Sequence, residues 1–256
     1  AAYEALSHKQ SSNLRSTQEY GIETSLVLPK FVFPLMEKER FIKENNPVTT
    51  ILAAYNFQEM PFYTRTIANS TFGYTWHSGE YHTHLVNPLQ LNFVNLVSID
   101  SAYRQRIERS SYLAYSYRDV MIMGGSYSYI FNNQKIKRSR DYWFMRINTE
   151  TAGNIPSLLK SISGASRTDG SYHILDQPFA QYVRADIDLR YNRILNDVSS
   201  VVYRGFIGVG VPYGNSRAIP FEKQYFGGGA NGIRAWQVRS LGPGSYKPDD
   251  SRFPNQ

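Results

Sequence analysis

The sequence contains no cysteine and no long apolar run, and each absence removes whole classes of protein. Without cysteine there are no disulfide frameworks, thiol nucleophiles or cysteine zinc sites. No apolar stretch approaches the roughly 18 residues that a membrane-spanning helix needs, which excludes a helical membrane protein. The first ten residues, AAYEALSHKQ, also lack the charged start and apolar stretch of a signal peptide. Because both ends read as the middle of loops, we expect the chain to be cut from something longer.

The sequence is unusually rich in aromatic residues. The 256 residues include 20 Tyr, 14 Phe and 3 Trp, and the formal net charge is +7. A hydrophobic content of 41% suits a folded chain rather than a disordered one.

Apolar and polar residues alternate with a period of two, most clearly over residues 178–192. One face carries aliphatic and aromatic side chains and the other carries full charges, a separation that a strand produces and a helix does not. The apolar set is Val183, Ala185, Ile187, Leu189 and Tyr191, and the charged set is Arg184, Asp186, Asp188 and Arg190.

About eight segments share this alternation, typically over ten to fourteen residues. Strands of soluble domains average about 5–6 residues, whereas a tilted membrane-spanning strand needs about 9–11. Charges and glycines on the polar faces, with Tyr and Trp at strand ends, favour an all-β, transmembrane antiparallel β-barrel. A soluble β-sandwich would show the same alternation and stays open as an alternative. The segments lie near residues 20–28, 49–57, 62–76, 88–98, 121–131, 143–149, 178–192 and 201–211.

Short and long connections also alternate, as in outer-membrane barrels. A short turn, NRILNDVSS, follows Tyr191, whereas a long insertion precedes Phe179 and contains an expected helical segment at residues 155–162. The long link at 30–46 interrupts this regularity on the presumed short-turn side.

A glycine-rich stretch at residues 226–246 contains a G-x-G-x-x-G spacing, but it does not read as a dinucleotide site. Such a site must follow a buried strand and open a helix. Here PFEKQYF precedes the glycines, and Gly242-Pro243-Gly244 would break any helix that followed.

The same stretch carries a resemblance to a known family. Residues 201–214 (VVYRGFIGVGVPYG), 220–236 (PFEKQYFGGGANGIRAW) and 238–246 (VRSLGPGSY) resemble the long extracellular loop region of the BamA/TamA outer-membrane insertase superfamily. SLVLPKFVFP and PFYTRTIANSTFGYTW are similar to the lipoprotein-type TamA relatives (TamL) of Bacteroidetes-like bacteria.

The resemblance implies that residues 1–256 belong to one sixteen-stranded barrel, of which strands four to eleven and the following loop are in this chain. Residues 216–256 would be the long extracellular loop that folds into the lumen. The final strands and the amino-terminal POTRA repeats would lie outside this chain. Open sheet edges in lipid are prohibitively costly, so we expect the remaining strands in the full-length protein.

The family's Val/Ile-Arg-Gly-Phe/Tyr element at the loop tip corresponds here to Ile233, Arg234, Ala235 and Trp236. The resemblance implies that Arg234 is a lumenal anchor and that Trp236 packs against the inner wall. Ala235 departs from the family's glycine, which would be costly if that position needed a positive φ.

A guanidinium in a lumen needs acidic partners. The family's partners lie on later strands, and Asp186, Asp188 and Glu23 are inward residues that would contribute to the charge balance here. The loop glycines Gly227, Gly228, Gly229 and Gly232 would let the backbone turn sharply on re-entry.

Two other clusters, one of histidines and one of basic residues, are better explained as turns than as functional sites. His77, Glu80, His82 and His84 fall in HSGEYHTH, but a fourth ligand is not evident, and we expect a periplasmic turn rather than a metal site. The basic run at 134–140 lacks an aromatic stacking platform, so a solvated turn or contact with lipid headgroups is favoured over nucleic acid. Nothing resembles Gly-x-Ser-x-Gly, so no hydrolase triad can be nominated. The resemblance implies a protein that is not an enzyme and needs no cofactor. A barrel with phospholipase activity stays open as a less favoured alternative.

The resemblance implies a function in the outer membrane of a Gram-negative bacterium. Such proteins insert client β-barrel proteins into the bilayer without ATP, through a weakly paired seam and local bilayer thinning. The implied partners are the outer-membrane lipid bilayer, the client barrels and periplasmic accessory proteins of TamB-like or Bam type. Alternatives are a two-partner secretion pore and a porin or receptor barrel.

Overall fold

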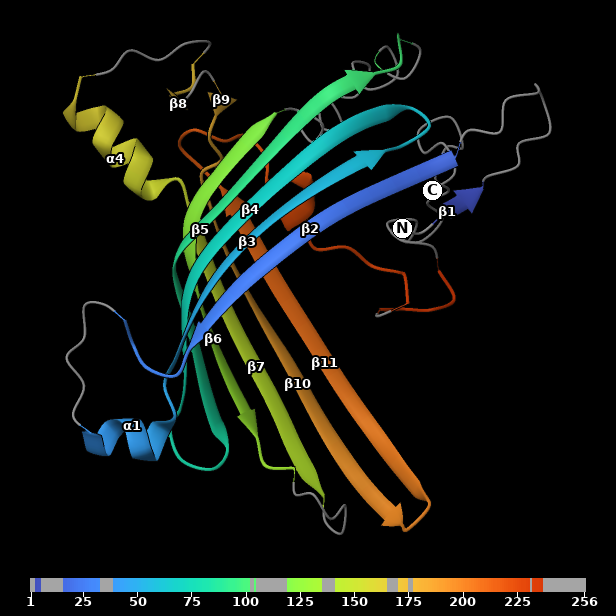
Figure 1. Cartoon of the computed structure of the whole chain (residues 1–256). Coiled ribbons are helices and arrows are strands. Elements are labelled where there is room, and N and C mark those ends of the chain that lie inside the picture. Colours follow the sequence, from blue (N-terminus) through green and yellow to red (C-terminus); the bar gives the residue numbers. More distant parts are fainter. Residues whose placement is uncertain are drawn as a thin grey trace.

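One curved antiparallel sheet dominates the computed structural model, which describes residues 3–5, 16–32, 39–101, 104, 119–134, 141–164, 170–174, 177–230 and 232–236. Its nine strands follow the order β1-β2-β3-β4-β5-β6-β7-β10-β11, and β8 pairs with β9 separately. The sheet forms part of a barrel wall (Figure 1), which confirms the predicted fold class. The strands are β1 (Tyr3–Ala5), β2 (Ser16–Leu28), β3 (Val48–Glu59), β4 (Tyr63–His77), β5 (His82–Ile99), β6 (Val120–Asn132), β7 (Tyr142–Ala152), β8 (His173–Ile174), β9 (Gln177–Pro178), β10 (Tyr182–Asn196) and β11 (Ser199–Pro212).

Eight of the strands are long enough to cross a bilayer. They run from 11 residues in β7 to 18 in β5, whereas a tilted membrane-spanning strand needs about 9–11. The expected helical segment is present as α4 (Asn154–Ile162), and two further short helices are α1 (Glu39–Asn45) and η1 (Phe221–Lys223). None of the helices within the described ranges is both long and apolar enough to span a membrane.

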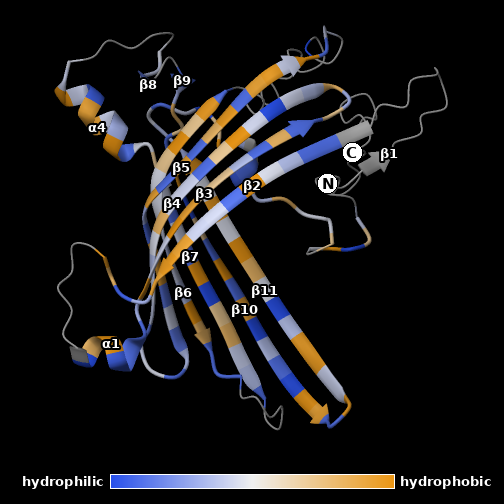
Figure 2. Ribbon diagram, viewed as in Figure 1, coloured by the Kyte–Doolittle hydropathy of each residue, from blue (hydrophilic) through white to orange (hydrophobic). Residues whose placement is uncertain are grey.

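The strand register places the apolar faces of successive strands on the same side of the sheet. Tyr129 pairs with Ile147, Ile147 with Ile187, and Ile187 with Ile207, and directly paired residues project to the same face. Ile207 is 74% exposed. On the opposite face Asp188 is fully buried, so the wall has apolar residues outside and charges inside. This pattern is typical of a transmembrane barrel, and the hydrophobic and hydrophilic bands alternate along β10 and β11 in Figure 2.

A bulge in β5 explains why this strand was hard to recognise in the sequence. Between Val86 and Leu89 three steps along β5 match two steps along β4, from Tyr74 to Phe72. The extra residue, Pro88, has no N–H to donate and is therefore suited to an interruption of the ladder. Alternation consequently changes phase, with Val86 and Leu89 both on the outer face.

The histidine cluster is arranged differently from the prediction. Only residues 78–81 form the turn, while His82 and His84 lie in β5. Their Nδ1 atoms hydrogen-bond the hydroxyls of Tyr129 and Tyr127 at 2.7 and 2.9 Å, and His84 stacks on Trp76. The two histidines therefore belong to an aromatic band on the outer face near the short turns. Among the described residues, no three metal-ligating side chains gather at one place.

Another aromatic group marks the same end of β7, β10 and β11. The rings of Trp143 and Tyr191 lie 4.6 Å apart, and Tyr191 stacks on Tyr203. Phe31, in the link before α1, contacts the rings of Phe41 and Tyr74. Of the predicted basic run, residues 135–140 lie outside the described residues.

Candidate functional site

Two glycines on the inner face of β11 leave space for the segment that follows this strand. A Cβ on Gly208 would stand 2.9 Å from Cζ of Tyr225, and one on Gly210 would meet the Ile219 side chain. Residues 219–225 therefore pack closely against the inner face of the wall. In Figure 1 this segment and η1 lie on the concave side of the sheet.

Tyr225 is fixed to β10 by its hydroxyl and by its ring. The hydroxyl donates to the Asp186 carboxylate at 2.7 Å and accepts from Nε of Arg184 at 3.2 Å. The Arg184 guanidinium lies 4.4 Å from the ring centroid, a cation–π contact. The pKa of Tyr225 is raised, mainly by burial and secondly by the hydrogen bond to Asp186. The phenol therefore keeps its proton and acts as the donor.

Charged contacts join the same segment to three strands. Nζ of Lys223 lies 2.7 Å from the Glu150 carboxylate on β7. The backbone carbonyl of Lys223 accepts from the Arg184 guanidinium on β10 at 2.9 Å. Glu222 pairs with Arg65 of β4 at 3.2 Å. These side chains are largely shielded from solvent, so both partners of each pair are needed to offset desolvation. We call residues 222–225 and these wall partners the lumenal clamp.

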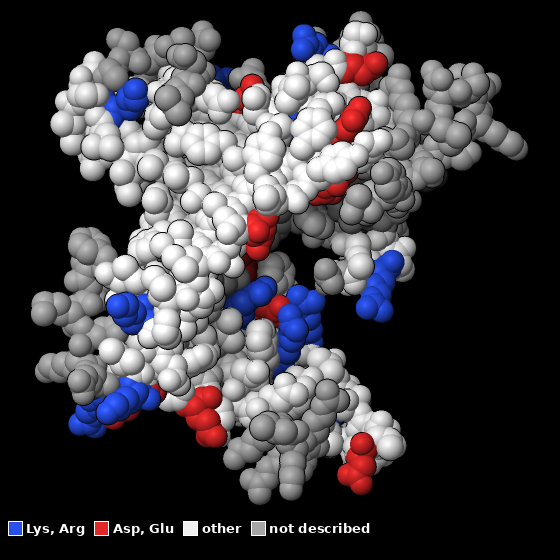
Figure 3. Space-filling view, in the orientation of Figure 1, with Lys and Arg blue, Asp and Glu red and all other residues white. Residues whose placement is uncertain are grey.

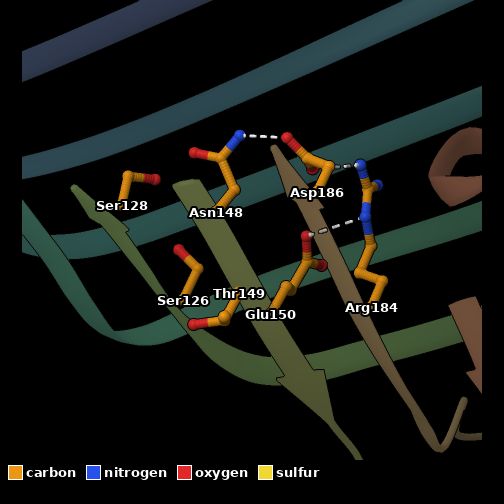
Figure 4. A pocket seen from close by; sticks show the side chains of 7 residues that line it. All are labelled: Ser126, Ser128, Asn148, Thr149, Glu150, Arg184 and Asp186. Atoms are coloured by element: carbon orange, nitrogen blue, oxygen red, sulfur yellow. Dashed lines mark hydrogen bonds and ion pairs between the residues drawn. The ribbon is translucent and has the colours of Figure 1, made fainter. Parts of the chain in front are cut away.

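A polar hollow of about 190 Å³ lies beside the lumenal clamp. Figure 4 shows Asn148 pointing toward Asp186, with Arg184 between Asp186 and Glu150. The Asn148 amide donates to Asp186 at 2.6 Å, which fills the carboxylate's second oxygen. The hollow is lined by Ser126, Ser128, Asn148, Thr149, Glu150, Arg184 and Asp186.

Asp188 forms a second charged group deeper along the inner face of β10. Arg190 and Arg204 each place two nitrogens on its carboxylate, at 2.7–3.1 Å. This bidentate geometry fits the planar guanidinium, and one buried carboxylate thereby joins two positions on β10 to one on β11. Acidic and basic side chains are visible within the hollow of the molecule in Figure 3.

The base of the segment after β11 is also tied to the wall. The Asn215 amide donates to the Phe179 carbonyl at 2.8 Å, and the Ser216 hydroxyl accepts from the backbone of Gln181 at 2.8 Å. A small buried cluster of Ile122, Ala152, Ala180 and Tyr182 lies at this end of the wall, with Ile219 packed against it. The exit from β11 is thus held in a defined direction.

The glycine-rich tip folds into a compact turn. Gly228 and Gly229 have φ of 88° and 86°, a conformation that strains other residues. The Gly229 amide donates to the Trp236 carbonyl at 2.8 Å, and the Arg234 side chain donates to the Ala230 carbonyl at 3.2 Å. Gly227 is not among the positive-φ residues. A Cβ on Gly232 would approach the Gly228 carbonyl oxygen to 2.9 Å.

Ala235 does not have a positive φ; among described residues other than glycine, Asn46 alone does. The departure from the family's glycine therefore carries no backbone strain here. Ile233 and Trp236 are each 49% exposed. The described part of the chain does not bring Arg234 to Asp186 or Asp188, whose carboxylates are taken by the partners above. Glu23 is exposed on β2 and makes no ion pair with a described residue.

The sequence prediction missed Tyr225, Lys223, Glu150 and the role of Arg184. Arg184 was placed correctly on the charged face of its strand. A further signal was available in Gly208 and Gly210, because two alternate glycines on an inward face indicate close approach of another segment.

The sequence of this chain matches a known protein family. A family model described as the Omp85 superfamily domain matches residues 5–252. No curated protein matches the chain.

Proposed function

Because the chain belongs to the Omp85 superfamily of outer-membrane protein assembly and translocation, we propose that it inserts client β-barrel proteins into the Gram-negative outer membrane. The insertion uses neither ATP nor a cofactor, and the chain has no enzymatic activity. The clients are unfolded β-barrel chains that reach the barrel from the periplasm.

The observation that carries this proposal is the lumenal clamp. The segment at 222–225 contacts β4, β7 and β10 together, through Arg65, Glu150 and Arg184. A segment fixed across the inner wall favours a barrel that works at its wall and rim over a porin, whose water-filled channel must stay open. In this proposal residues 216–256 are the lumenal loop, and Arg234 anchors its tip to acidic residues of the complete barrel.

The finer family assignment is also a proposal. The resemblance of residues 25–34 and 61–76 to TamL proteins supports a TamA-like role, with a TamB-like periplasmic partner rather than Bam-type accessory proteins. Association with one type of partner when the full-length protein is purified from its native membrane would separate the two roles.

Reconstitution tests the function directly. The full-length protein is placed in liposomes, a urea-denatured client barrel is diluted into them, and folding is followed by the heat-dependent mobility of the client on gels. We expect faster client folding than in liposomes that contain a porin-type barrel, without nucleotide. Equal rates in the two preparations contradict the insertase function. Transfer of a secreted protein into the lumen without client folding would favour the two-partner secretion alternative.

A further inference from the structure

Helix α4 (Asn154–Ile162) carries a row of apolar side chains that the protein leaves uncovered. Ile155, Leu158, Leu159 and Ile162 are 59%, 61%, 62% and 75% exposed. Their spacing of i, i+3, i+4 and i+7 puts them on one stripe of the helix. In a water-soluble setting such a stripe would be buried against another element.

The helix leaves the wall from the side rather than from the rim. Gly153 has a φ of 78°, and its amide donates to the Met123 carbonyl of β6. Two residues earlier in β6, the Met121 carbonyl accepts instead from the amide of Ala180, which belongs to a later part of the chain. β6 therefore continues past the point where the chain departs into α4. In Figure 1 the helix lies on the convex side of the sheet, opposite the lumenal clamp.

Side-chain contacts hold the first turn of the helix in place. Asn154 donates to the Thr151 hydroxyl at 2.7 Å and accepts from the Tyr213 hydroxyl at 2.6 Å. A Cβ on Gly153 would meet the Ala180 carbonyl and Gln181, so the chain passes this point in close contact with the wall. The direction of α4 is thus set by β7 and by the end of β11.

The outer face of the barrel beside the start of α4 is itself apolar. Thr151, two residues before Gly153, pairs with Val183, and Val183 pairs with Val211. The two valines are 43% and 54% exposed on the outer face. The helix also has a single charge, Lys160, and no acidic residue in its first turn, a composition that suits an anionic headgroup layer.

We propose that α4 lies in the outer-leaflet interface beside β6 and β7, with Ile155, Leu158, Leu159 and Ile162 inserted among lipid acyl chains. Amphipathic helices of this kind sit about 5–10 Å into the boundary between headgroups and acyl chains. The proposal requires only that the barrel stand in a membrane, and it is independent of the insertase function.

Residues 1–256 contain no cysteine, so once any cysteine elsewhere in the full-length protein has been replaced by serine, a single introduced thiol can carry an environment-sensitive fluorophore at each helix position. The full-length protein with Leu158→Cys, Leu159→Cys, Ser157→Cys or Ser161→Cys is labelled, reconstituted in anionic liposomes, and exposed to nitroxide-labelled lipid or to aqueous iodide. Heat-dependent gel mobility shows that each variant is folded. We expect nitroxide lipid to quench positions 158 and 159 more strongly than 157 and 161, and iodide to show the reverse order.

Two results would overturn the proposal. Equal access of iodide to all four positions would place the helix in water. Protection of positions 158 and 159 from both quenchers would mean that protein, not lipid, covers the stripe.

Discussion

Gly208 on β11 faces the ring of Tyr225, and the missing side chain is what allows the ring to lie against the wall. We expect Gly208→Ala to displace Tyr225, because the added methyl group would stand 2.9 Å from Cζ. Overpacking of this kind costs about 1–3 kcal/mol. The measurement is trypsin cleavage after Lys223 in the folded barrel, which should become faster as the segment leaves Glu150.

Gly205 provides a matched control on the same strand, since a Cβ there has no neighbour within 4 Å. Gly205→Ala should leave cleavage at Lys223 unchanged. If both variants behave alike, the close approach of Tyr225 to β11 is wrong.

Tyr225→Phe keeps the ring and removes the hydroxyl. The change leaves the buried Asp186 carboxylate without its 2.7 Å donor, a loss worth about 1–3 kcal/mol. We expect a lower midpoint of urea-induced unfolding in detergent micelles and faster cleavage at Lys223. Tyr203→Phe, on the exposed outer face, should change neither measurement.

Asp188→Asn should weaken the wall itself. The carboxylate is the common partner of Arg190 and Arg204, and a neutral amide would leave two guanidinium groups side by side. Removing one member of a buried pair costs about 3–5 kcal/mol, and we expect roughly 1–3 kcal/mol here because both arginines are partly exposed. Chemical unfolding in micelles measures the effect, with Asp197→Asn in the β10–β11 turn as the comparison. A variant as stable as the parent would show that the cluster contributes little.

Arg234→Ala tests the loop tip. In the proposed lumenal role, the variant should insert client barrels more slowly while keeping its own strands, as judged by circular dichroism and heat-dependent gel mobility. Arg40→Ala removes an exposed arginine whose partner is Glu44, and should have no effect on insertion. Normal client insertion with Arg234→Ala would count heavily against the anchor.

Asp141 gives the turn end of β10 a dependence on pH. Its carboxylate accepts from the Tyr191 hydroxyl at 2.6 Å and from the Ile194 amide at 2.8 Å, and these bonds hold the pKa of Asp141 below its usual value. The folded state therefore takes up the proton at lower pH than the unfolded chain. The bonds contribute fully above the ordinary carboxyl pKa of about 4 and are lost as the pH falls through the lowered value.

Hydrogen exchange of the peptide that contains Ile194, corrected for intrinsic rates, measures this effect. Protection should fall at acidic pH in the parent protein. Asp141→Asn should show weak protection that does not change with pH, below that of the parent at neutral pH and similar to it at acidic pH. A parent whose corrected protection is constant with pH would contradict the role of Asp141.

The sequence was sufficient for the wall and insufficient for what packs inside it. Strict alternation identified Asp186 and Asp188 as inward residues, because a strand has only two faces and full charges avoid lipid. The start of β5 could not be found in this way, since the bulge at Pro88 changes the phase of the pattern. Alternation likewise gives no information about which loop residue meets a given strand, so Tyr225 and Lys223 emerged only from the fold.

The bulge also bears on how this barrel tolerates changes of chain length. Deletion of Pro88 would leave Val86, Leu89 and Leu91 on the outer face, because residues 82–96 would then alternate without interruption. Deletion of a residue between Leu89 and Leu96 would instead turn part of the strand inside out and direct apolar outer-face side chains into the charged interior. Homologous chains that differ by one residue in this strand are therefore expected to differ at this position or at the second irregularity, between Leu96 and Ser98.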